Sequence, residues 1–150
     1  MNYCIPAPER LKAMLSMLTG EEVKADKQDA VVEGGKYHGV FINADDNVVA
    51  IASCNMVSAA SLGCSLTMIP PGGAEAMVED AELTPNATDN LYEVMNVLSS
   101  LFMDDSSAHL KLARVEVGDA PAIDIEETET TTLGVELGRY GKLEIGFVAS

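Results

Sequence analysis

Glu93 and Asn96 are the two residues whose types and spacing best suit chemistry on a helix surface. They form the only Glu-x-x-Asn pattern of the chain, and residues three apart on a helix are surface neighbours. A carboxamide is both a donor and an acceptor, so Asn96 can orient a water molecule. Glu93 can bind a cation on a partner. Asparagine is a poor helix former, so its place inside a helical segment indicates a role other than helix stability.

The helix that must carry this pair is predicted over residues 85–102. Thr84 is placed to cap it, and Pro85 suits its first turn. At about 100° per residue, one arc of the helix collects apolar side chains: Leu91, Val94, Met95, Leu98, Leu101 and Phe102. The opposite arc collects polar side chains: Asp89, Glu93, Asn96 and Ser100. We therefore expect the polar arc to face solvent while the apolar arc holds the helix on a core.

The remaining elements indicate how that core is built. A mixed segment over 22–32 has Val23, Val31 and Val32 as possible strand residues. Helical spacing predicts further helices over 8–18, 56–67 and 74–82. Strand patterns predict one hairpin from 38–43 and 47–53, and a group of strands over 109–117, 130–137 and 142–148. Grouped strands and grouped helices predict a single α+β domain over 1–150, with an antiparallel sheet packed against helices.

Composition limits the classes of partner. The chain has 150 residues, 24 acidic and 9 basic side chains, and a formal net charge of −15. Such a surface is repelled by nucleic acid and by anionic membranes. The remaining partners are proteins with a basic patch and small molecules. Alternatively, the charge serves only to keep the protein soluble. No apolar run reaches the length of a membrane span and no signal peptide is evident, so the cytoplasm is the expected compartment.

Other residue types capable of chemistry favour structural interpretations. Cys54 and Cys64 lie among small and apolar residues and read as buried thiols, and the chain has no Cys-x-x-Cys pair. We expect neither a disulfide framework nor a metal site. Six further features read as structural or surface elements rather than ligands, bases, calcium loops, a phosphate loop or a triad: His38, His109, the acidic segments 45–47 and 126–129, the connector 70–73, and the serines 99–100.

The pattern Asp89-x-x-x-Glu93-x-x-Asn96 on a long amphipathic helix resembles the signature of the CheC/CheX/FliY phosphatases of bacterial chemotaxis. The order of elements over residues 8–148 is also similar to that family, and having one Glu-x-x-Asn pattern is similar to the single-site CheX type. The resemblance implies hydrolysis of the aspartyl phosphate of a response regulator such as CheY.

In that reading, Asn96 positions the attacking water and Glu93 pairs with the regulator's active-site lysine. Asp89 and Ser100 would contact the phosphorylated receiver domain. The chain would bind no cofactor of its own, since the regulator supplies Mg²⁺. This division of labour is coherent, because phosphoryl transfer depends mostly on positioning and charge stabilisation.

Two alternatives stay open. Met95 stands where the family often has glycine, and the family's proline after the helix has no clear match. Both departures favour a non-catalytic CheC-like module that binds a protein in chemotaxis or two-component signalling. The other alternative is a structural oligomer that pairs through an exposed strand edge. A homodimer is compatible with all three interpretations.

Overall fold

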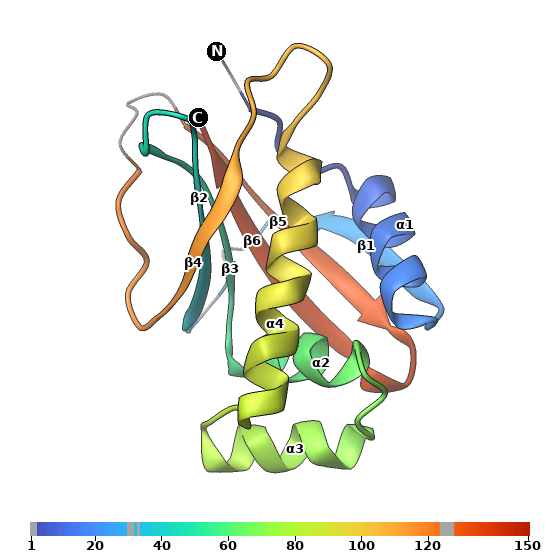
Figure 1. The fold of residues 1–150 in the computed structure, drawn as a ribbon. Coiled ribbons are helices and arrows are strands. Elements are labelled where there is room, and N and C mark those ends of the chain that lie inside the picture. The colour runs from blue at the N-terminus through green and yellow to red at the C-terminus, as the bar shows by residue number, and fades with distance from the viewer. Residues whose placement is uncertain (1–2, 30–31, 33, 124–127) are drawn as a thin grey trace.

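The structure, a computed structural model, describes residues 3–29, 32, 34–123 and 128–150. Within them the chain forms helices on one face of an antiparallel sheet (Figure 1). The helices are α1 (Pro8–Thr19), α2 (Met56–Ser65), α3 (Pro71–Asp80) and α4 (Pro85–Leu98), with short 3₁₀ turns η1 (Ser99–Phe102) and η2 (Gly138–Tyr140). The strands are β1 (Val23–Gln28), β2 (Tyr37–Ile42), β3 (Val48–Cys54), β4 (Lys111–Val117), β5 (Glu129–Leu137) and β6 (Lys142–Ala149).

The sheet has the strand order β1-β5-β6-β3-β2-β4, and every neighbouring pair is antiparallel. The hairpin β2–β3 and the hairpin β5–β6 are joined in the middle, where β3 pairs with β6. β1 and β4 are therefore the two edge strands. The predicted α+β class with an antiparallel sheet is confirmed.

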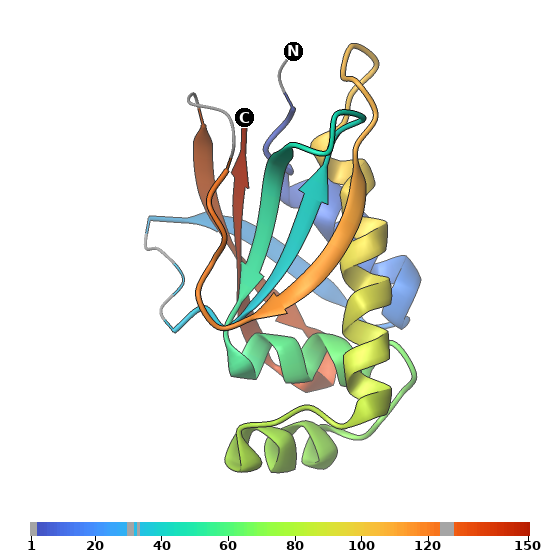
Figure 2. The ribbon, with the colours of Figure 1, turned by 60° about the vertical axis from the view of Figure 1, so that its left-hand side comes forward.

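The helices form a layer on one face of this sheet. α4 and α1 stand against it, α2 lies across its lower end, and α3 lies below α2 (Figures 1 and 2). Figure 1 shows α4 in yellow along the front of the molecule, where no described segment passes over its outer side. This arrangement leaves one side of α4 for the core and the other for solvent.

Most predicted elements are confirmed, and two differ. The mixed segment resolves into β1, in which Val23 is buried and the next five residues are mostly exposed. Val32 belongs to no strand, and Val31 lies outside the described residues. We expected Pro70–Gly73 as a connector and a helix over 74–82, which is wrong at its start. α3 begins at Pro71, because proline at the first helical position needs no N–H partner and already has a helical φ. The long helix continues to Phe102 as predicted, but its last turn tightens to 3₁₀ at Ser99.

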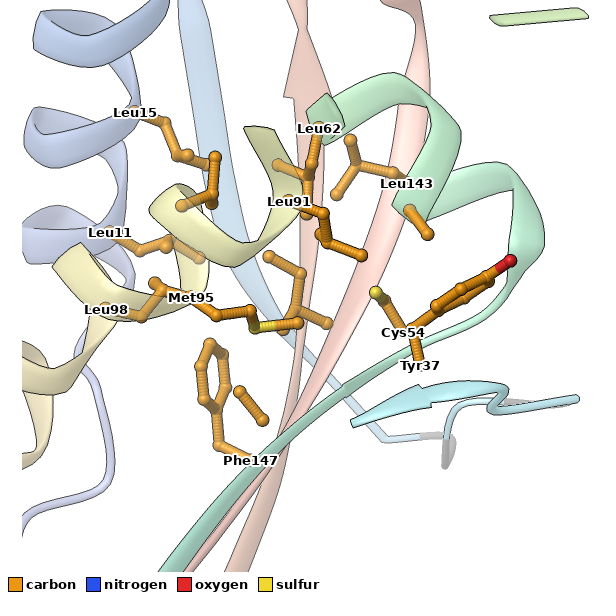
Figure 3. Close-up of a cluster of buried hydrophobic side chains, with 14 of the residues drawn as sticks. Leu11, Leu15, Tyr37, Cys54, Leu62, Leu91, Met95, Leu98, Leu143 and Phe147 are labelled. Atoms are coloured by element: carbon orange, nitrogen blue, oxygen red, sulfur yellow. The ribbon is translucent and has the colours of Figure 1, made fainter. Parts of the chain in front are cut away.

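The core lies between the helices and the sheet. Figure 3 shows side chains of α1, α2, α4 and β6 that meet in this layer, among them Leu11, Leu62, Met95 and Phe147. Phe102 extends it, with its ring centroid 5.0 Å from that of Phe41 and 5.7 Å from that of Phe147. A second, smaller cluster lies on the other face of the sheet and contains Val40, Val48 and Ile51.

Candidate functional site

The candidate site lies on α4, and the sequence defines where this helix begins. Thr84 has extended backbone angles, and its side-chain oxygen accepts a hydrogen bond from the Ala87 N–H at 3.3 Å. Pro85 occupies the first helical position. These features satisfy one of the free N–H groups and fix the direction of the first turn, as the sequence predicted.

The inner face of α4 holds the helix on the core. Its apolar residues Leu91, Val94, Met95 and Leu98 are all at most 1% exposed. Met95 points inward beside Leu98 (Figure 3) and lies over Gly39 of β2, where an added Cβ would stand 2.9 Å from the Met95 sulfur. The side chain at position 95 therefore fills core space and does not reach the outer face of the helix.

A polar contact fixes α4 against α2. Asn90 is 7% exposed, and its amide nitrogen donates to the Gly63 carbonyl and to the Thr67 hydroxyl, both at 2.8 Å. At Gly63 the two helices touch through their backbones, since an added Cβ would stand 2.7 Å from the Ala87 carbonyl oxygen. Sequence reasoning missed this contact, although Asn90 falls at the border of the apolar arc, where a polar side chain needs a buried partner.

The outer face of α4 presents the four residues that the sequence placed there. Asp89, Glu93, Asn96 and Ser100 are all exposed. Within the described chain, the carboxylates of Asp89 and Glu93 and the carboxamide of Asn96 have no protein partner. The Ser100 hydroxyl donates to the Val97 carbonyl at 3.1 Å, so it faces a partner only as an acceptor.

The charge of this face is negative. Pro85–Leu98 contains Asp89 and Glu93 and has no lysine or arginine. Arg10 of α1 approaches the far end of the face, where its guanidinium donates to the Ser100 carbonyl at 3.1 Å. The outer face thus combines a carboxylate and a carboxamide one turn apart, both free to engage a second molecule. Such a pair can hold a cation and a water molecule next to each other.

The other sequence candidates lie elsewhere. His38 is 3% exposed and bridges Ser53 Oγ and the Gly118 carbonyl oxygen, both at 2.7 Å from its ring nitrogens. It is a structural histidine, as predicted, and it ties the chain after β4 to β2 and β3. His109 is exposed. Among the described residues, no group of three or more His, Cys, Asp or Glu side chains could hold a metal ion.

Turns and thiols account for most of the remaining candidates. Asn43 Oδ1 accepts from the N–H groups of Asp45 and Asn47, which makes 45–47 part of a tight turn. Residues 124–127, and with them part of the acidic segment 126–129, lie outside the described residues. Cys54 and Cys64 are buried, as predicted, and burial raises the pKa of the Cys54 thiol to about 12.

The helices described here include none that is long and apolar enough to span a bilayer.

A comparison of the sequence with family models and with curated proteins finds no match. Comparison of the folded chain with solved structures does find matches at low identity.

The FliM middle domain of H. pylori aligns with a TM-score of 0.64 and 9% identity, over 95% of this chain and 84% of that one. CheX in a CheX–CheY–BeF₃–Mg²⁺ complex from Borrelia burgdorferi gives 0.57 and 12%, over 92% of both chains. CheX from Desulfovibrio desulfuricans gives 0.52 and 14%, over 93% of both chains.

FliY of Thermotoga maritima and a CheC-like protein of Shewanella oneidensis are also similar in structure. All of these likenesses span nearly the whole of this chain, so they concern the complete arrangement of helices and sheet. Their identities are too low to carry more than the fold. The chain has the fold shared by the CheX, CheC and FliY chemotaxis proteins and the FliM middle domain.

Proposed function

We propose that this chain is a cytoplasmic phosphatase of the single-site CheX type, which hydrolyses the aspartyl phosphate of a CheY-type response regulator. One observation carries the proposal. Glu93 and Asn96 are exposed, one turn apart, with no side-chain partner in the part of the chain that the structure describes, on a helix whose inner face is anchored by a full row of core residues. A rigid helix that presents free polar groups suits insertion into the active site of another protein.

In the proposed reaction, a water molecule attacks phosphorus while the bond from phosphorus to the aspartyl oxygen breaks. The Asn96 carboxamide oxygen accepts a hydrogen bond from that water and holds it in line with the leaving carboxylate. The products are the free aspartate of the regulator and inorganic phosphate. No nucleophile of this chain takes part, and Mg²⁺ belongs to the regulator.

Glu93 provides the second contact in this proposal. Its carboxylate pairs with the active-site lysine of the regulator and fixes the helix in register over the phosphoryl group. Asp89 lies one turn before Glu93 and would contact the rim of the same receiver domain. Ser100, at the other end of the face, would offer its hydroxyl oxygen to the receiver domain as an acceptor. Met95, which stands where the family often has glycine, is buried and leaves this surface free.

The experiment is a dephosphorylation assay with a purified receiver domain charged by a small-molecule phosphodonor. Wild-type chain should accelerate the loss of aspartyl phosphate in proportion to its concentration. Glu93→Ala should remove most of the acceleration and leave the thermal midpoint unchanged, because this side chain has no partner among the described residues. A wild-type chain that leaves the decay rate unaltered with every receiver domain of its host would contradict the proposal.

A second candidate is a non-catalytic binding module of chemotaxis or two-component signalling. It is favoured by the TM-score of 0.64 with the FliM middle domain, which exceeds the 0.57 and 0.52 with the two CheX structures. Structures of FliM in complex with SpeE and with FliG show that FliM itself binds other proteins. Saturable binding of a receiver domain by this chain, without faster dephosphorylation, would decide for the module.

A further inference from the structure

A hollow of about 620 Å³ lies beside the outer face of α4, between this helix and the edge strand β4. We call it the α4–β4 groove. Leu83, Asp89 and Tyr92 line it on the helix side, and Ala113, Val115 and Val117 line it on the strand side. Its floor is formed in part by Leu91 and Tyr37, which belong to the core. The groove is thus a mainly apolar depression in an otherwise acidic surface.

Two large apolar residues stay exposed on its walls. Tyr92 is 44% exposed and Val117 is 64% exposed. A tyrosine in this setting gives a broad apolar contact at a low cost in side-chain entropy, and tyrosine is enriched at the centres of protein interfaces. An aromatic ring and a β-branched side chain that border one groove therefore indicate a surface that a partner covers.

The groove is continuous with the proposed site. Tyr92 directly precedes Glu93 and lies four residues before Asn96, so Tyr92 and Asn96 are neighbours on the helix surface. Asp89 belongs both to the polar face and to the groove lining. A protein that brings a phosphorylated side chain to Asn96 would therefore come close to Tyr92.

The charges around the groove indicate what its occupant carries. Of the two cations of the lining, Arg114 pairs with the carboxylate of Glu116, whereas the Lys36 ammonium donates to the neutral Ala81 carbonyl at 3.0 Å and keeps its charge. The acidic side chains Glu82 and Asp89 have no such partner among the described residues. Counted with Glu116, the charged groups at the groove are three carboxylates and two cations, a net charge of −1, and this surface fits an apolar side chain that stands beside a lysine or arginine.

We propose that the α4–β4 groove binds an apolar side chain of the same receiver domain that the polar face of α4 would address, with Tyr92 as the anchor. This inference rests on the proposed function and adds a specificity site to it. Glu93 and Asn96 act on the phosphoryl group, whereas Tyr92 determines the affinity for the receiver domain and the choice among receiver domains.

The test separates affinity from turnover. Binding of the beryllofluoride-activated receiver domain is measured by calorimetry, and the dephosphorylation assay gives kcat and KM. Tyr92→Ala should raise both Kd and KM by about tenfold or more and leave kcat within about twofold, since the ring contacts no reacting atom. Tyr92→Phe keeps the ring and should bind like wild type. Met17→Ala, which truncates a 78% exposed apolar side chain on α1, is the matched control and should change nothing.

Each other outcome has one meaning. Wild-type binding that Tyr92→Ala leaves unaltered overturns the groove assignment and leaves the proposed function in place. If the groove instead binds a second copy of this chain, Tyr92→Ala should dissociate a dimer and leave the Kd for the receiver domain unchanged. This result would also overturn the groove assignment. Wild-type chain that binds no activated receiver domain overturns the proposed function, and this inference with it.

Discussion

Asn90 and Asn96 stand on the same helix, and the difference between them separates structure from function in α4. Asn90 is buried, and its amide donates twice across to α2 and the loop that follows it. Asn96 is exposed, and no described residue engages its carboxamide. One asparagine is explained by packing inside the chain. The other has no internal explanation, and it lies beside a free carboxylate.

The comparison teaches that residue type alone does not mark a functional site. Both asparagines are equally poor helix formers, and each interrupts a segment that alanine would serve better. What differs is the angular position, since Asn90 borders the apolar arc and Asn96 lies near the centre of the polar arc. Substitutions that affect only stability or only activity can therefore test whether the two roles are separate.

Asn96→Ala has the largest expected effect. If the carboxamide positions the attacking water, its loss should lower the dephosphorylation rate by about 10²–10³-fold, the range for removal of one preorganised hydrogen-bonding group. The thermal midpoint should stay within about 1 °C, because the Asn96 carboxamide has no hydrogen-bond partner among the residues that the structure describes. Equal rates for Asn96→Ala and wild type would place the water-positioning group elsewhere. Asn86→Ala, at an exposed position in the first turn of α4, is the control.

Gly63→Ala should be the most destabilising change on the structural side. The new Cβ would stand 2.7 Å from the Ala87 carbonyl oxygen, so α2 and α4 must separate, at a net cost of about 1–3 kcal/mol. Alanine has a higher helix propensity than glycine, but this gain is smaller than a cost in the upper part of that range. Denaturant unfolding gives the difference. Gly72→Ala in α3 is the matched control, because nothing lies within 4 Å of its Cβ position, and its stability should equal or exceed that of wild type.

Some elements of the fold can be predicted from local sequence signals, and others cannot. The bounds and faces of α4 follow from local signals, namely the Thr84 cap, Pro85 and a clear 3.6-residue period. β1 has only a short signal of this kind, because Val23 is its one buried residue and the alternation of apolar and exposed residues ends after Ala25. The start of α3 cannot be predicted in this way, because two prolines and two glycines usually interrupt a helix, whereas here Pro70 caps the helix and Pro71 begins it.

The same distinction between local signals and packing applies to the candidate site. Glu93 and Asn96 are three residues apart, so one helical period was enough to place them together. Asn90 finds its partner Gly63 at a separation of 27 residues, and the groove beside Tyr92 exists only because the edge strand β4 passes next to α4. Contacts of this kind depend on how elements pack, which no local pattern specifies.

Asn90→Ala should have the smallest of these effects. It is informative because it should lower stability and leave activity unchanged. The change removes two hydrogen bonds, one of them to a carbonyl inside the core, and should lower the free energy of unfolding by about 1–2 kcal/mol. The fraction that remains folded should dephosphorylate the receiver at the wild-type rate, because the outer face of α4 is unchanged. A variant with wild-type stability and lost activity would reverse the assignment of the two asparagines. It would then place the reacting water on the α2 side of the helix, where the Gly63 carbonyl and the Thr67 hydroxyl would have to hold it.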